Sequence, residues 1–365
     1  MYAFLFFLNF LLVYTVFAVY AERKISAFIQ DRYGPMETGY YGLLQTVADL
    51  LKLIQKEDIV PLKADRKLFK PAPVIIFTAV FAGFAVLPLT SGFSGSSAQI
   101  GIFYLLAIVS LDVVGILMAG WGSNSKYALW GAMRSVAQII SYEIPLGLMV
   151  VCVVLIAQTL NLQEITYQQG IWWGHQKAEA ANYLFGIKAL GIETTHIGGV
   201  LTWNIMRSPL LLIGFVIFFI ASLAESNRAP FDIPEAESEL VAGFHVEYSG
   251  FRWSMIMLAE YGMMLLVAFL ASILFLGGWN SPFPNIGGVR LAEWTSGIPG
   301  TWPGHLWGAF WMISKALFLV AVQMWIRWTY PRLRLDQLMS LSWKYLTPAS
   351  ILLVLLCAVW RLLML

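Results

Sequence analysis

The sequence predicts an all-α polytopic membrane protein, and two observations support that class. Of the 365 residues, 59% are hydrophobic and only 12% are charged, and the mean hydropathy is +0.72, as in chains that cross a bilayer several times. Apolar runs of about 20 residues, enough to span about 30 Å of hydrocarbon as a helix, recur along the chain. The net charge of +2 gives no indication of a nucleic-acid partner.

We expect a single integral membrane domain, residues 1–365, with about eight transmembrane helices. The apolar runs lie near residues 3–21, 72–91, 101–121, 132–159, 207–225, 253–278, 306–327 and 343–363. The first run is expected to remain as a helix and not to be cleaved as a signal peptide, because Arg23 and Lys24 follow it and no basic residue precedes it. Cys152 and Cys357 lie in apolar runs without a CxxC or Cys/His grouping, so we expect core or lipid-facing cysteines rather than metal ligands.

The positions of Lys and Arg predict which connections face the cytoplasm. Of the 23 basic residues, 17 fall in the first, third, fifth and seventh connections and their flanks, and basic residues concentrate on the cytoplasmic side. We therefore predict cytoplasmic loops at about residues 22–71, 122–131, 226–252 and 328–342. Both termini and a long loop at about residues 161–206 are expected on the opposite side, and the tryptophans of that loop are interpreted as interfacial anchors.

One segment of the first connection is amphipathic. Apolar residues recur at helical spacing from Leu43 to Ile54, with Gln45, Asp49 and Lys52 between them. This pattern predicts a helix that lies in the membrane interface.

Carboxylates are concentrated between the fifth and sixth apolar runs. The segment AESNRAPFDIPEAESELVAGFHVEYSG, residues 224–250, contains six carboxylates and one arginine. Asp232 and Glu235 are suited to a helix start, but the helix dipole supplies only roughly 0.3–1 kcal/mol per acid, which does not explain six of them. Charge at this density beside hydrocarbon indicates a functional site.

Four more ionisable residues fall inside predicted spans: Asp112, Glu143, Glu260 and Lys315. Each costs roughly 2.5–3.5 kcal/mol on insertion scales unless it is neutral, paired or hydrated. Two interpretations stay open. The residues line an internal polar route, or they form paired charges, for instance Lys315 with a carboxylate, that hold helices together.

Three further stretches, together with the acid-rich segment, resemble one family. They are ERKISAFIQDRYGP at 22–35, GLLQTVADLLKLIQKED at 42–58 and GWGSNSKYALWGAMRSVAQIISYE at 120–143. In this order and spacing they resemble the NuoH family, the membrane subunit of respiratory complex I that lies beside the quinone site. The resemblance implies a non-redox subunit of the proton-pumping NADH:quinone oxidoreductase that is not catalytic alone.

The resemblance also implies roles for individual residues. Those matching positions near the quinone chamber are Arg23, Gln30, Arg32, Asp49 and Arg228. Those matching the acidic proton relay are Glu143, Glu225, Asp232, Glu235, Glu237, Glu239, Glu247 and Glu260. Asp112 matches no position that carries a role, and His245 stands where Asn or another small polar group is expected, so we interpret it as a neutral, hydrogen-bonding histidine.

Electron carriers are expected on other chains, because this sequence has no Rossmann GxGxxG, haem CxxCH, flavin or cluster motif. The resemblance implies quinone as substrate, and FMN and iron–sulfur clusters on partner subunits. The implied partners are peripheral-arm subunits that carry the terminal cluster and the quinone headgroup pocket, small membrane subunits, antiporter-like subunits and lipid. The implied location is an energy-transducing membrane, the bacterial inner membrane.

Two other functions are weighed against this one. Membrane subunits of energy-converting hydrogenases and formate hydrogenlyase share the helix plan but house no quinone, and we do not expect the full AESNRAPFD and VEYSG pattern in them. A stand-alone ion transporter or channel would use the acids to coordinate a cation, but the sequence has no paired broken helices or inverted repeat.

Overall fold

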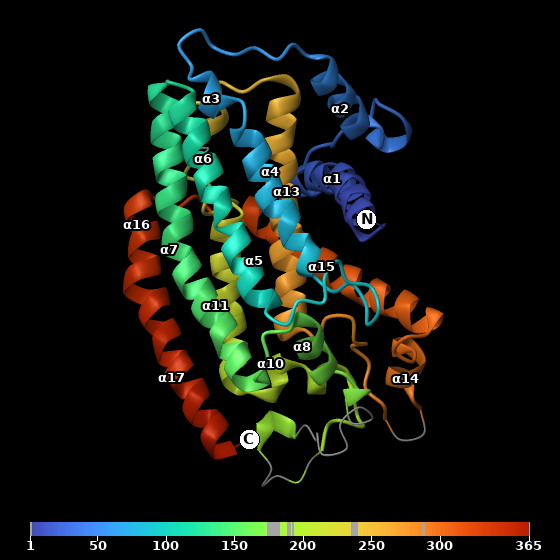
Figure 1. The fold of residues 1–365 in the computed structure, drawn as a ribbon. Coiled ribbons are helices and arrows are strands. Elements are labelled where there is room, and N and C mark those ends of the chain that lie inside the picture. The colour runs from blue at the N-terminus through green and yellow to red at the C-terminus, as the bar shows by residue number, and fades with distance from the viewer. Residues whose placement is uncertain are drawn as a thin grey trace.

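The computed structural model describes residues 2–173, 183–187, 191, 193–234, 240–286 and 289–364, which form a bundle of tilted helices (Figure 1). The main helices are α1 (Tyr2–Ile29), α4 (Ala72–Gly83), α5 (Gly101–Val109), α6 (Leu111–Gly122), α7 (Lys126–Ala157), α11 (Pro209–Glu225), α13 (Gly250–Phe275), α15 (Trp302–Thr329) and α17 (Thr347–Met364). The shorter elements are η1 (Tyr40–Gly42), α2 (Gln45–Gln55), α3 (Arg66–Phe69), η2 (Phe84–Val86), α8 (Leu162–Gln168), η3 (Leu184–Gly186), η5 (Gly199–Thr202), α10 (Asn204–Arg207), η6 (Gly243–His245), α14 (Leu291–Ser296), α16 (Leu335–Ser340) and the π-helical η7 (Leu341–Leu346).

Seven helical stretches of the described chain are long and apolar enough to cross a bilayer. They are Leu5–Ile29, Arg66–Val86, Gly101–Gly122, Lys126–Ala157, Gly250–Phe275, Trp302–Thr329 and Leu335–Leu363. The remaining predicted run is also helical, as α11, but has only 17 residues. The all-α polytopic class is therefore confirmed, with one of the eight helices shorter than the rest.

Helix α1 extends beyond the apolar run that predicts it. α1 continues past its apolar run to Ile29, because no glycine or proline interrupts that stretch, and the chain leaves the helical conformation at Asp31, where φ is 50°. Glu22 and Arg23 therefore lie on a transmembrane helix, not in the loop predicted to begin at residue 22.

Helix α13 forms the centre of the bundle, between α4, α11 and α15. Every residue from Tyr261 to Phe275 is buried, as expected for a helix that is apolar on all faces and is surrounded by other helices. Cys152 and Cys357 also lie in the core, in agreement with the prediction for them.

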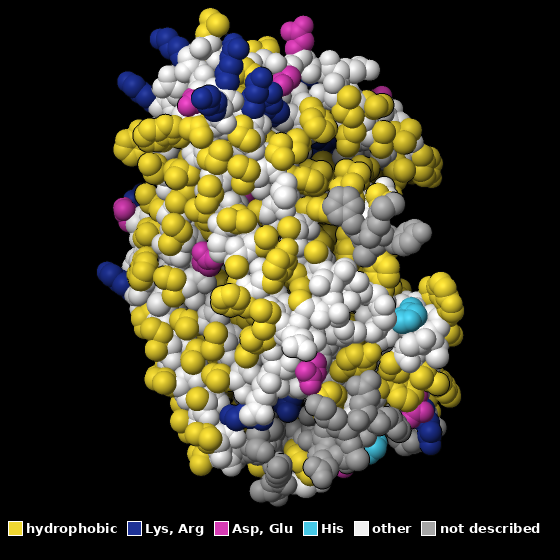
Figure 2. All heavy atoms as spheres, viewed as in Figure 1, with side chains coloured by type: hydrophobic (Ala, Val, Ile, Leu, Met, Phe, Trp, Pro, Cys, Tyr) yellow, Lys and Arg dark blue, Asp and Glu magenta, His cyan; other side chains and the backbone are white. Residues whose placement is uncertain are grey.

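The predicted amphipathic segment is helical, as α2. Leu51 and Ile54 are more than half exposed, whereas Thr46 is buried against the bundle. Figure 2 shows Lys and Arg side chains gathered at the end of the molecule where Figure 1 places α3, above sides that are largely hydrophobic. This distribution fits water at the α3 end and hydrocarbon around the middle; which end faces the cytoplasm stays a prediction.

Lys315, inside α15, is held by backbone oxygens and not by a carboxylate. Its Nζ donates to three carbonyls that follow α13, those of Leu276 (2.7 Å), Gly278 (2.9 Å) and Asn280 (2.6 Å). The same ammonium lies 4.2 Å from the centre of the Trp203 ring. Trp203 is only 8% exposed, so its interpretation as an interfacial anchor is wrong, and α10, which begins directly after it, packs against α11 and α13.

Candidate functional site: a lateral cavity and an acidic cavity

A lateral cavity of about 730 Å³ lies between α1, α2, α13 and α15. Its apolar walls include Leu8, Leu12, Val16, Val19, Leu50, Leu53, Ile54, Phe77, Phe251, Met257 and Leu258. Leu12, Ile54 and Phe251 are also exposed on the molecular surface, so the cavity opens sideways through an apolar rim. Charged side chains line it near the C-terminal part of α1. A cavity of this size with few polar groups has the character of a small-molecule site.

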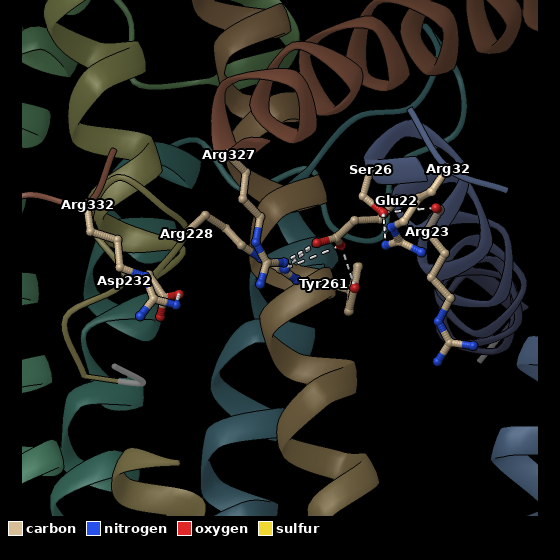
Figure 3. A network of polar contacts seen from close by, with 9 residues as sticks. All are labelled: Glu22, Arg23, Ser26, Arg32, Arg228, Asp232, Tyr261, Arg327 and Arg332. Carbon is tan, nitrogen blue, oxygen red and sulfur yellow. Dashed lines mark hydrogen bonds and ion pairs between the residues drawn. The ribbon is translucent and has the colours of Figure 1, made fainter. Parts of the chain in front are cut away.

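The polar end of the lateral cavity is built around Glu22 (Figure 3). This carboxylate accepts hydrogen bonds from Arg228 (3.3 Å to each oxygen), from Arg327 and from the Tyr261 hydroxyl (2.5 Å). The Arg228 guanidinium also lies 4.4 Å from the centre of the Tyr261 ring. Glu22 and Arg228 are only 5% and 6% exposed, and such buried charges persist only when paired and hydrogen-bonded.

Two of the residues matched to the quinone chamber, Arg23 and Asp49, line the lateral cavity. Arg23 Nη1 donates to Asp49 Oδ2 at 2.6 Å, which joins α2 to α1. A third, Arg228, reaches the cavity through Glu22. Gln30 and Arg32 do not line the cavity; both are exposed beyond the end of α1, where Arg32 Nε donates to Gln30 Oε1 at 2.7 Å.

A second, acidic cavity of about 20 Å³ lies deeper in the bundle. Three carboxylates from three helices line it: Asp112 of α6, Glu225 of α11 and Glu260 of α13. Asp112 is 8% and Glu225 5% exposed. Asp112 Oδ1 and Glu225 Oε2 are buried without a hydrogen-bond partner in the described structure, which is rare for polar atoms in protein interiors.

Glu143 of α7 adjoins this group. Its carboxylate accepts a hydrogen bond from the Ser110 hydroxyl, at the break that separates α5 from α6. Glu143 and Asp112 are both electrostatic neighbours of Glu225. The structure therefore brings together three of the predicted relay residues, Glu143, Glu225 and Glu260. It adds Asp112 to this group, a residue that matched no position with a known role.

The depth of the acidic cavity follows from the short α11. Glu225 is the last residue of α11, whereas Glu260 is about ten residues into α13 and Asp112 about ten residues before the end of α6. Ten helical residues span about 15 Å, so α11 stops about 15 Å below the ends of its neighbours.

The chain after α11 therefore runs through the bundle at membrane depth. Irregular backbone is tolerated there only where protein surrounds it, and Gln138 of α7 supplies donors. Its side-chain amide donates to the carbonyl oxygens of Ala224 and Phe231, both at 2.8 Å. The segment also links the two cavities, because Ser226 and Asn227 line the acidic cavity while the next residue, Arg228, binds Glu22.

Of the other predicted relay residues, the two that the structure describes, Asp232 and Glu247, line neither of these cavities. Asp232 is buried, and its Oδ2 accepts a hydrogen bond from Arg332 at 3.1 Å. Glu247 is half-buried between η6 and α13. Glu235, Glu237 and Glu239 lie outside the described residues, so their predicted role has no structural account. His245 is buried, with its ring edge-on to Phe244.

Sequence reasoning missed Glu22, Tyr261 and Arg327. Glu22 is the first residue of the stretch ERKISAFIQDRYGP, and Arg327 ends a predicted span, so both resembled ordinary charges that flank a helix. Glu22 is 206 residues away from its partner Arg228 and 305 residues away from its partner Arg327 along the chain. A local sequence pattern cannot predict a contact between residues so far apart in the chain.

Comparisons with known proteins find relatives over almost the whole chain. A family model described as NADH dehydrogenase matches residues 2–358. The NADH-quinone oxidoreductase H subunit 2 of Cytophaga hutchinsonii is 59% identical over 360 residues, 99% of this chain and 98% of that protein. The H subunit of the same enzyme from Chlorobaculum parvum is 53% identical over 344 residues (94% and 87%), and that from Geobacillus thermodenitrificans is 44% identical over 348 residues (95% and 89%).

Proposed function

Because this chain belongs to the family of the NADH-quinone oxidoreductase H subunit, a membrane subunit of complex I, we propose that its lateral cavity is the membrane part of the quinone-binding chamber. The observation that carries the proposal is the distribution of apolar and polar groups in that cavity. Its walls are apolar and open at an apolar rim, while charged groups and a tyrosine hydroxyl occupy one end. A quinone combines a long apolar tail with a polar headgroup, so its two parts match the two parts of the cavity.

Quinone reduction would act on the acidic cavity through the segment 225–228. A change in the charge or protonation of the quinone headgroup would alter the electric field at Glu22 and Arg228. Asn227 and Glu225, which lie just before Arg228 in the chain, line the acidic cavity. Each unit of pKa shift corresponds to about 1.4 kcal/mol of interaction, so a nearby charge change is enough to move a proton between closely matched carboxylates. The acids would pass that proton shift to neighbouring subunits.

The electron path lies outside this chain in the proposal. An iron–sulfur cluster on a peripheral-arm subunit would reduce the quinone, with FMN further upstream, and the charged α3 end would contact that arm. Small membrane subunits and antiporter-like subunits would receive the proton shift. The location would be the bacterial inner membrane. The relatives described above are all named as quinone oxidoreductase subunits, which favours this function over the hydrogenase and transporter alternatives.

Filling the lateral cavity tests the quinone assignment. In the assembled complex, Leu258→Trp places extra volume in the cavity wall and takes space from the quinone, so the KM for quinone should rise about tenfold, which corresponds to about 1.4 kcal/mol of binding. Leu355→Trp, on a 61% exposed part of α17, is the matched control and should change nothing. NADH oxidation by a soluble acceptor should stay normal in both. An unchanged quinone KM in Leu258→Trp would contradict the assignment.

A photoreactive quinone supplies an independent check. Labels should fall on α1, α2 and the first half of α13, whose residues line the cavity. Labelling confined to the outer loop around Trp172 would rule out lateral access from the bilayer.

The relay is tested by removing single titrating groups. Glu225→Gln and Glu260→Gln keep the size and much of the hydrogen bonding of Glu but remove the titrating proton site. Quinone-dependent NADH oxidation and proton pumping should both fall, while oxidation by a soluble acceptor persists. Normal turnover and pumping in both variants would remove the relay from this chain.

A further inference from the structure

Asp112 and Glu225 combine features that a structural role does not explain. Both side chains are more than nine-tenths buried, both line the acidic cavity, and each has an oxygen without a hydrogen-bond partner among the described residues. Leaving a buried polar atom unpaired costs roughly 1–3 kcal/mol. A residue that only held helices together would have been paired, so something other than the described side chains completes this site.

The size and chemistry of the cavity identify its occupant. One buried water needs at least about 10–15 Å³ and two to four polar partners. The acidic cavity has about 20 Å³, and its polar lining comprises three carboxylates with Ser226 and Asn227. One water molecule therefore fits, with enough polar groups in the lining to serve as its partners.

The carboxylates also require protons. An ionised carboxylate can only accept hydrogen bonds, and two carboxylates that share a site cannot both ionise readily, so one of them takes up a proton. Asp112 and Glu225 come from different helices around one small space, with no basic side chain in the lining.

We propose that Asp112 is a proton-binding residue of the relay, and that it shares one exchangeable proton with Glu225 through a water molecule in the acidic cavity. The inference rests on the proposed function. In the transfer step, the Asp112 carboxylic acid gives its proton to the water while the water gives one of its own to the Glu225 carboxylate. Asp112 is left ionised, Glu225 is left neutral, and the water is restored.

The charged groups around Asp112 allow this exchange. Glu143 faces the cluster from α7, where Ser110 holds it, and Glu260 faces it from α13. Helix α4 has no titratable side chain, and η6 presents His245 next to the lining residue Phe244. The nearest arginine along the chain from Glu225, Arg228, is bound to Glu22. Asp112 thus belongs to one group of acids with Glu143, Glu225 and Glu260.

The test uses the assembled complex with Asp112→Asn, Glu225→Gln and the double variant. Asn is isosteric with Asp but carries no titrating proton. If the proton is shared, each single change should lower quinone-dependent proton pumping at least about tenfold, and the double change should be no worse than either. Glu293→Gln, which removes a partly exposed acid of α14, is the control and should pump normally.

Infrared difference spectra between the oxidised and reduced complex supply a second readout. A protonated-carboxyl band that shifts in D₂O should be present in the parent complex and absent in both single variants. NADH oxidation by a soluble acceptor reports assembly.

Each outcome decides the inference. Normal pumping in Asp112→Asn with a defect in Glu225→Gln would overturn the role of Asp112 and leave the proposed function intact. Normal pumping in Asp112→Asn, Glu225→Gln and Glu260→Gln would overturn both. A double variant whose loss is the product of the two single losses would show independent sites and would overturn the shared proton.

Discussion

Lys315 and Asp112 are equally buried, each with 8% of its surface exposed, yet their surroundings are opposite. The three donors of Lys315 meet three backbone carbonyls, and an indole face covers the ammonium. Asp112 faces other acids across a small cavity, and its Oδ1 has no partner in the described structure. The contrast separates a buried charge that stabilises the fold from one whose site is completed by a water and a proton. Mutations should therefore separate stability from function.

The largest loss of stability should follow from Lys315→Met. The change keeps an unbranched apolar chain but leaves three buried acceptors unpaired, each worth about 1 kcal/mol or more, so the complex should be destabilised by at least about 3 kcal/mol. The temperature at which the detergent-solubilised complex dissociates measures the effect. If that temperature did not change, the carbonyl cluster would not be the anchor that its geometry indicates.

Tyr261→Phe should have an intermediate effect. It removes the 2.5 Å hydrogen bond to Glu22 but keeps the ring beside Arg228, and a hydrogen bond to a charged group contributes roughly 1.5–3 kcal/mol. We expect lower thermal stability together with a raised KM for quinone. Tyr104→Phe, at an exposed position of α5, is the control; an equal loss there would show that the hydroxyl of Tyr261 is not special.

Asp49→Asn should cost less than about 1 kcal/mol of stability, because its partner Arg23 is 43% exposed and solvent screens the pair. The KM for quinone should still rise, since both residues line the lateral cavity. Asp58→Asn breaks a comparable pair with Arg252, and neither of these residues lines that cavity, so it should match in stability but not in KM. Equal KM values for the two variants would place Asp49 outside the quinone path.

Asp112→Leu should have the smallest effect on stability, neutral or slightly favourable, because it replaces a buried carboxyl whose Oδ1 has no partner among the described residues with an apolar side chain of similar size. Proton pumping should nevertheless fall. A large loss of assembled complex would mean that Asp112 belongs with Lys315, as part of the framework.

The sequence predicts the spans well, because hydrocarbon thickness sets the length of an apolar run in any context. It also places Glu143, Glu260 and Asp112 at membrane depth by counting residues along a helix. It cannot predict which helices face one another, so the convergence of Asp112 and Glu225 emerges only from the structure. The Glu22 cluster was missed for the same reason, and so was the contact between Trp203 and Lys315, which are far apart in the sequence.

The early end of α11 has a consequence for how the protein is made. The polar segment after Glu225 cannot face lipid. The helices that surround it must therefore already be in place when it leaves the translocon. α6 and α7 precede it in the chain and supply one side, including Gln138; α13 follows and supplies the other. We therefore expect α11 and α13 to enter the bilayer as a pair. A ribosome-stalled chain in which α11 has left the ribosome but α13 has not should keep α11 in contact with the translocon, and release of α11 into lipid at that length would show that the helix inserts alone.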